Sequence, residues 1–197
     1  MSVKTKWLID PIHSEIAFKV KHLMITNIKG LFKEFEASIY TTGDDFMTAE
    51  IDFWMNPASV DTGSPDRDMH LKSADFLDVE NHKEITFLSN TYEQVDGDGS
   101  YELWGDLSIK GIVKRIKLDV EFGGVVRDPW GNEKAGFTIN GKINRNDWGL
   151  NWNSLLETGG VLVSNDVSVS CEVQLLKSNE ESEPAGEQKR SETAFNK

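Results

Sequence analysis

Apolar and polar residues alternate along eight separate segments of the chain, with the two-residue period of half-buried β-strands. In the last segment, for example, Val167, Val169 and Cys171 alternate with Ser168 and Ser170. Each such strand offers one apolar face and leaves the other to water, which is typical of antiparallel sheets. The predicted strands cover residues 14–22, 31–41, 47–55, 84–93, 100–110, 114–123, 134–145 and 166–176.

Closing this sheet into a barrel would remove its exposed strand edges. An eight-stranded barrel is just wide enough to be filled by side chains or to enclose one small ligand. The predicted fold class is therefore all-β, an eight-stranded antiparallel β-barrel with a short helical insertion between the third and fourth strands. The side chains that share the inward phase, and would line a cavity, are Phe18, Phe35, Ile39, Ile51, Phe53, Phe87, Leu107, Leu118, Phe137 and Val169.

The insertion spans residues 56–79, where the alternation stops and Asp, Ser, Arg and His become frequent. Ser64 followed by Pro65 is typical of a helix start, so we predict a helix over 66–72 and a second helical turn at 75–77. This pair would cover one end of the barrel. Its inward residues would be Met69, Leu71, Phe76 and Leu77, of which we assign Leu71 and Phe76 to the cavity lining, and Arg67, Asp68 and His70 would rim the opening.

Composition narrows the classes of function and partner. A net charge of −12 argues against nucleic acid as a partner, and against docking onto anionic lipid through a basic patch. The single cysteine, Cys171, excludes an internal disulfide and any Cys-based zinc cluster, and we interpret it as a small buried hydrophobe. No apolar run reaches the length of a signal peptide or of a membrane span, so we expect a soluble, cytoplasmic protein. Residues 1–177 form the predicted barrel domain, and 178–197 a disordered acidic tail.

Few residues suggest catalysis or metal binding. A hydrolase would need Ser14 with Asp68 and His70, or His13 with His70, but the chain has no GxSxG motif. Asp68 and His70 are the only close pair of metal ligands. The acidic residues at 96–99 favour a hairpin turn over a calcium loop. We therefore predict no catalytic residue, no metal and no cofactor.

Three segments resemble sequence elements of the YceI-like family of lipid-binding proteins. They are WLIDPIHSEIAFKVKH at 7–22, RDMHLKSADF at 67–76 and RNDWGL at 145–150, in the family's order. The resemblance implies a lipocalin-like barrel with a hydrophobic cavity that binds a long polyisoprenoid, such as an isoprenoid quinone or a polyprenyl phosphate. It also implies a dimer in many members and a periplasmic location with a signal peptide, from which this sequence departs. A second departure is His82-Lys83, where the family often has a proline in second place.

The leading hypothesis is a non-enzymatic carrier or store for an isoprenoid lipid. Arg67 or His70 would contact the polar head group, or else the charged residues of the insertion would only hold the lid in place. Two rivals remain: an enzyme with His70 as acid/base, and an interaction module whose barrel is filled. Outward-facing Trp54 and Trp104 would form a dimer face or a rim that touches a membrane transiently, or would only pack locally.

Overall fold

The computed structural model describes residues 4–95, 97, 99–157 and 159–178, and nearly all of its regular structure is β-strand. The long strands alternate between buried and exposed positions because successive side chains point to opposite faces of the sheet. The strands are β1 (Lys4–Ile9), β2 (Glu15–His22), β3 (Thr26–Phe32), β4 (Phe35–Thr42), β5 (Asp45–Met55), β6 (Val60–Asp61), β7 (Ile85–Gln94), β8 (Ser100–Ile109), β9 (Ile112–Arg127), β10 (Glu133–Asn144) and β11 (Val163–Lys177).

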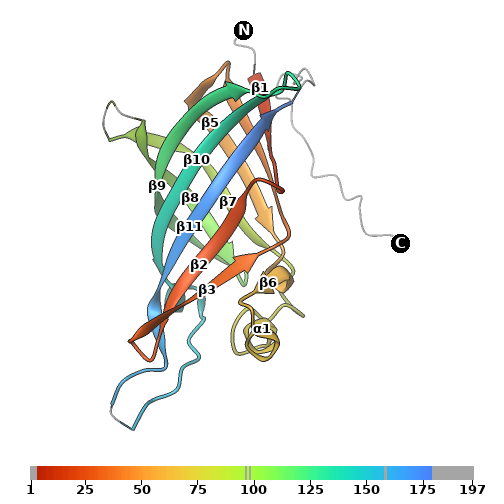
Figure 1. Ribbon diagram of the computed structural model, residues 1–197. Helices are drawn as coiled ribbons and strands as arrows, with labels where there is room; N and C mark the ends of the chain where they lie inside the picture. Colours follow the sequence, from red (N-terminus) through yellow and green to blue (C-terminus); the bar gives the residue numbers. More distant parts are fainter. Residues whose placement is uncertain (1–3, 96, 98, 158, 179–197) are drawn as a thin grey trace.

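Eight of these strands form a closed antiparallel barrel, which confirms the predicted fold class (Figure 1). The order around the ring is β1-β4-β5-β7-β8-β9-β10-β11, and β1 closes it by pairing with β11. One edge of β11 pairs with two strands in turn. It pairs with β1 near Leu175 and with β2 from Glu172 to Val163. At that end the wall continues through β3 and β6.

The set of strands differs from the prediction on the N-terminal side of α1, where the two-residue β6 in the insertion was also not predicted. β1 and most of β3 were not predicted, and the predicted strand 31–41 is divided between β3 and β4, with a break at Lys33 and Glu34. In β3 the alternation is interrupted because Gly30 stands at an inward position. The ring of Phe18 from β2 occupies the space that a side chain at Gly30 would need.

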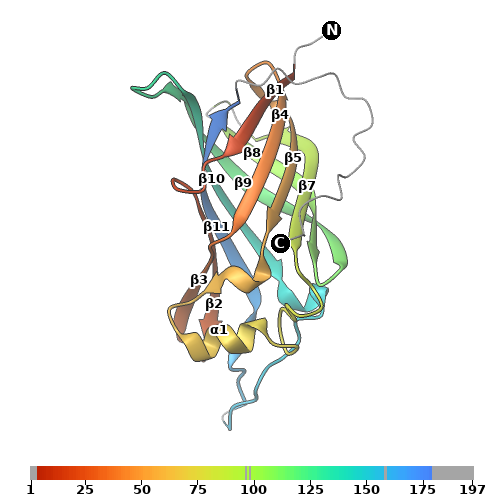
Figure 2. The same ribbon diagram turned by 90° about the vertical axis from the view of Figure 1, so that its right-hand side faces the viewer.

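The insertion forms a lid at one end of the barrel (Figure 2). A short 3-10 helix, η1 (Pro57–Ser59), leads through β6 to α1 (Pro65–Lys72). Ser64 is the N-cap residue of α1, as predicted, although its side chain makes no capping hydrogen bond. The predicted helical turn at 75–77 is wrong: the segment is a hydrogen-bonded turn in which the Phe76 amide donates to the Ser73 carbonyl at 3.1 Å.

Met69 does not face the barrel, contrary to the prediction, because its side chain is exposed. Arg67 and Leu71, which are four residues apart, share the inward side of α1, and Met69 between them points away. Phe76 and Leu77 are buried, as expected.

The β7–β8 hairpin forms where the Asp-Gly pairs predicted it, with Gln94 opposite Tyr101. Asp96 and Asp98, the acids of the calcium-loop alternative, lie outside the described residues, as does the predicted tail after Ser178. Within the described part of the chain, no helix has the length and apolar character that a membrane span requires.

Candidate functional site

The barrel encloses a cavity of about 550 Å³ whose wall is almost wholly apolar. This volume lies in the range of small-molecule sites in proteins. The alternative of a filled barrel is therefore wrong. Side chains from every strand of the ring contribute to the wall because the inward phase of each strand is apolar. The predicted residues that line the cavity are Phe18, Ile39, Ile51, Phe53, Leu71, Phe76, Phe87, Leu107, Leu118, Phe137 and Val169.

Phe35 is the one predicted lining residue that the structure places elsewhere. It begins β4 opposite Met55, and its buried ring packs in the hydrophobic core without lining the cavity. Alternation along a strand gives the face on which a side chain lies. It does not show which inward side chains reach the open space: Met55, directly opposite on β5, lines the cavity, whereas Phe35 packs against its neighbours in the core.

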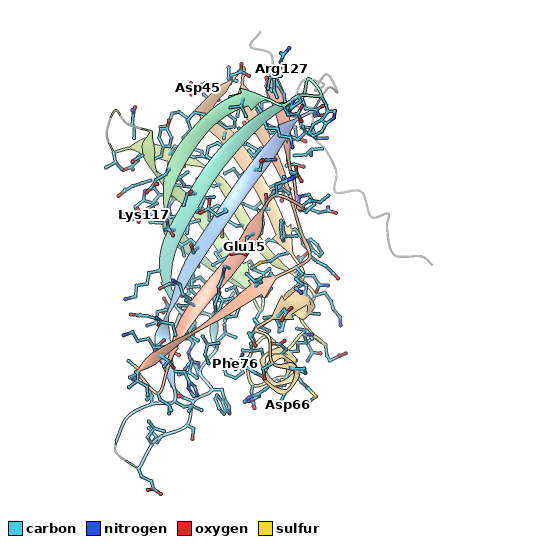
Figure 3. All side chains as sticks on the ribbon, viewed as in Figure 1. Glu15, Asp45, Asp66, Phe76, Lys117 and Arg127 are labelled. Carbon is cyan, nitrogen blue, oxygen red and sulfur yellow. The ribbon has the colours of Figure 1, made fainter. Side chains whose placement is uncertain are left out.

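Most polar side chains of the wall gather at the end of the barrel that α1 covers (Figure 3, where Phe76 marks this end), while Tyr92 and Tyr101 line it near the β7–β8 hairpin. Those at the α1 end come from the end of β2, from the lid and from the segment that follows β10. His70 of α1 forms a cluster with two aromatic rings, with its ring centre 5.1 Å from that of Phe76 and 4.5 Å from that of Trp152, which are themselves 5.2 Å apart. The polar residues at this end are His22, Thr62, Arg67, His70, Arg145 and Trp152.

Hydrogen bonds to Thr62 hold the lid against β6. Arg67 donates from Nε to the Thr62 hydroxyl and from Nη2 to the Thr62 carbonyl, both at 2.8 Å. Asp68 accepts from the Thr62 amide at 2.9 Å and from its hydroxyl at 2.5 Å. The prediction that Asp68 rims the opening is wrong, because its carboxylate is used on the outer side of the lid and does not line the cavity. Arg67 both holds the lid and faces the cavity.

Arg145 is the most deeply buried polar residue of the cavity wall, with 3% of its surface exposed. Its Nε donates to the Ser164 carbonyl at 2.9 Å, and its Nη1 to the carbonyls of Trp152, at 2.8 Å, and Leu150. Its Nη2 is buried with no hydrogen-bond partner, and no ion pair to Arg145 occurs among the described residues. Burial lowers the pKa of this guanidinium below its usual value, although it stays a cation at neutral pH.

Arg145 was not assigned to the site from the sequence, although one signal pointed to it. Ile139 and Ile143 lie on the inward phase of β10, and Arg145 continues this phase at the start of η2 (Arg145–Trp148). Burying an unpaired charge is unfavourable. A charged residue at an inward position of an otherwise apolar strand therefore indicates a role in the site or in holding the chain around it.

The residues considered for catalysis are not brought together. The hydroxyl of Ser14 accepts a hydrogen bond from the Gln174 amide at 2.9 Å, and His13 Nδ1 lies 2.8 Å from Asp10. His70 Nε2 lies 2.9 Å from Asp75, which is exposed. Among the described residues, no cluster of three or more His, Cys, Asp or Glu side chains has the geometry of a metal site.

Cys171 is a buried free thiol of the cavity wall. Burial raises its pKa to about 11, so the thiol is protonated and unreactive at neutral pH.

Trp54 and Trp104 are half-buried on the outside of the barrel, and the Arg115 guanidinium lies 5.9 Å from the centre of the Trp104 ring. Whether they form a dimer face or a membrane rim stays a prediction.

A closed antiparallel barrel around one apolar cavity, with a short helical lid, defines the class of lipocalin-like barrels. Residues 7–175 match the model of the YceI-like domain, and the chain therefore belongs to the YceI-like family. The three sequence elements that suggested this family lie within the matched region, at the β1–β2 segment, the lid and η2.

Relatives and solved structures agree with this assignment. A UPF0312 protein of Staphylococcus epidermidis is 36% identical over 176 residues, which cover 89% of this chain and 99% of the relative. The crystal structure of the Campylobacter jejuni YCEI protein is 33% identical with a TM-score of 0.67, and the match covers 81% of this chain and 90% of that one. A polyisoprenoid binding domain from Saccharophagus degradans shares the fold, with 14% identity, a TM-score of 0.60 and coverage of 87% and 98%.

Proposed function

We propose that this protein binds and carries a long-chain isoprenoid lipid, without chemical conversion, in the cavity of its barrel. The observation that supports this most directly is the enclosed apolar wall, which offers a long hydrocarbon chain contacts from every strand of the ring. Removing apolar surface from water is favourable by roughly 25 cal/mol per Å² and requires no directional contact. The binding domain from Saccharophagus degradans, named for polyisoprenoid, has the same fold and is in line with this proposal.

The polar end of the cavity is suited to the head group of such a lipid. An isoprenoid quinone offers carbonyl oxygens and a polyprenyl phosphate offers anionic oxygens, and both accept hydrogen bonds from guanidinium groups. Arg67, His70 and Arg145 would supply the donors, with the Trp152 ring in edge-to-face contact with His70. The hydrocarbon chain would then extend away from the lid, into the part of the barrel lined by Phe53, Phe87 and other apolar side chains.

Lipid extraction of the purified protein, followed by mass spectrometry, tests the proposal. We expect an isoprenoid lipid to be recovered, or else uptake of an added isoprenoid quinone by protein that was purified empty. Val169 lines the cavity, and its neighbour Ser168 is exposed on the outer face of β11. Val169→Trp should therefore lower the amount of bound lipid several-fold, because the indole fills space that the chain needs, whereas Ser168→Trp should not.

Two outcomes would decide against this function. Protein that is consistently empty and also takes up no added quinone would show that the cavity does not hold such a lipid. Recovery of a chemically altered lipid, abolished by His70→Ala with uptake unchanged, would favour the enzyme with His70 as acid/base. Circular dichroism of each variant would show that the barrel is retained.

A further inference from the structure

Large apolar side chains are exposed in two segments at the end of the barrel that carries the lid. The β2–β3 turn presents Leu23, Met24 and Ile25, and Ile25 is 80% exposed. The long loop between η2 and β11 presents Leu155, which is 82% exposed. The β2–β3 turn lies at the level of α1, and the long loop extends past α1 at the lower end of the molecule in Figures 1 and 2. We call them together the apolar tips.

The apolar tips are held in place by hydrogen bonds. Leu23 and Met24 have φ values of 51° and 58°, a left-handed conformation that is unfavourable for residues other than glycine. It is fixed because the Leu23 amide donates to the Leu162 carbonyl at 2.8 Å, which also ties the two segments together. A backbone bridge between Leu155 and Val161 orders the loop. The exposure of these side chains is therefore built into the fold.

The apolar tips adjoin the mouth of the cavity. His22, which directly precedes Leu23, lines the cavity, and so do Leu162 and Trp152 of the neighbouring loop. Exposed apolar surface is therefore continuous with the polar end of the site. An apolar surface at this position is suited to a partner that exchanges a lipid with the cavity.

Positive charge on the β2 and β3 side of the apolar tips favours an anionic partner there. The outward phase of β2 and β3 carries Lys19, Lys21 and Lys29, all exposed. Lys29 pairs with Glu15 at 2.5 Å, while Lys19 and Lys21 have no ion pair among the described residues. Exposed acids at this end lie on the α1 side, at Asp66, Asp75 and Glu80, and in the long loop at Glu157, two residues from Leu155, so the basic side is that of β2 and β3.

We infer that the apolar tips insert into the head-group region of a bilayer that contains anionic lipids, so that the cavity mouth faces the membrane. Ile25, Met24 and Leu155 would be buried among the acyl chains, and Lys19 and Lys21 would lie near the phosphates. Because the chain has a net charge of −12, binding depends on this local arrangement and on the apolar contact. The purpose of this contact rests on the proposed function, but the observations behind it do not.

Vesicle flotation tests the inference. The full chain should float with vesicles of phosphatidylcholine and phosphatidylglycerol and much less with phosphatidylcholine alone. The double variant Ile25→Ser and Leu155→Ser should lower the bound fraction about tenfold or more, because each side chain loses a favourable transfer from water. The matched control is Trp130→Ser, which removes an 82% exposed side chain from the β9–β10 turn at the opposite end and should bind as the wild type does. Figure 3 labels Arg127 near that turn.

A second pair of variants tests the charge. Lys19→Gln with Lys21→Gln should remove the preference for phosphatidylglycerol, whereas Lys117→Gln with Arg127→Gln, further from the tips on β9 (Figure 3), should retain it. No flotation of the wild type, or equal loss in the Trp130 control, would overturn the inference. So would a dimer, measured by light scattering, that the tip variant abolishes, since a second copy would then cover this surface. Bound lipid is measured in parallel: flotation of a protein that binds no lipid would reject the proposed function and retain the membrane contact.

Discussion

Arg145 is a buried cation that donates to carbonyl groups and has no carboxylate partner in the described part of the chain. Its replacement by methionine would leave the carbonyls of Ser164, Leu150 and Trp152 without their donor. Unsatisfied buried acceptors are unfavourable by about 1–3 kcal/mol each, partly offset here because a buried charge is also removed. We expect Arg145→Met to lower the free energy of unfolding by about 2 kcal/mol, measured by urea denaturation of lipid-free protein.

The same variant tests whether Arg145 binds the head group. If its free Nη2 donates to the lipid, then the stabilisation gained on loading with a quinone should fall in Arg145→Met and recover in part in Arg145→Lys, which keeps the charge. Equal stabilisation of wild type and methionine variant by the lipid would restrict Arg145 to a structural role. Ser168→Met, on the exposed outer face of β11, is the control.

At the scale of single residues, the period-two pattern predicted most of the cavity wall. It could do so because inward phase and apolar character coincide on strands such as β5 and β10. It failed for Met69 and Asp68, whose directions depend on how an eight-residue helix is rotated over the barrel, a tertiary property. The contact of Arg67 or His70 with a head group stays a prediction.

At the scale of elements, Gly105 shows how two neighbouring strands are fitted together. It lies at an inward position of β8, and the Phe87 ring of β7 covers it. A methyl group at Gly105 would overlap this ring and would lie 2.8 Å from the Leu88 carbonyl oxygen, which belongs to the backbone and moves little. Gly105→Ala should therefore lower the free energy of unfolding by about 1–3 kcal/mol, the range for overpacked cores.

Thermal and urea denaturation would measure this effect against Gly136→Ala. Gly136 also lies within a strand, β10, but a methyl group there would contact nothing within 4 Å. We expect this control to be neutral or slightly stabilising, because alanine lowers the entropy of the unfolded chain. A similar loss in both variants would mean that strand propensity, and not the contact with Phe87, determines the effect.

Strands and the lid helix were predicted where local chemistry determines them. Asp-Gly pairs located the β7–β8 hairpin, and Ser64-Pro65 located the start of α1. β3 was missed because Gly30 breaks its alternation, and the reason for that glycine is the Phe18 ring on another strand. β1 is short, and only Trp7 of it is fully buried, so its pattern carries little local signal.

At the scale of the whole molecule, two different strands pair with the same edge of β11 and close the barrel wall at its two ends. β1 closes the end away from the lid, and β2, with β3 and β6, continues the wall at the lid end. The chain passes from one closure to the other at 10–14, where Asp10 donates its amide to Gln174 of β11. Local pattern could predict eight strands and closure, but not which strands close the ring, because pairing depends on residues far apart in sequence.

This closure gives β1 an importance that its length does not suggest. Trp7 is completely buried, its indole N–H donates to the Thr41 hydroxyl at 3.1 Å, and its ring centre lies 5.0 Å from that of Phe46. Trp7→Ala would leave a large void where β1 joins β4 to β11. We expect it to lower the free energy of unfolding by about 3–5 kcal/mol.

The neighbouring residue provides the control, because Leu8 lies on the opposite face of the same strand and is 38% exposed. Leu8→Ala keeps the pairing of β1 and should change the free energy of unfolding by about 0.5–1 kcal/mol, which urea denaturation resolves from the effect at Trp7. If closure through β1 holds the ring together, Trp7→Ala should also make the protein prone to aggregation, because the edges of β4 and β11 become free to pair with other chains. Equal stability of the two variants, with no change in aggregation, would show that the barrel is held closed without β1, by the pairing of β2 with β11.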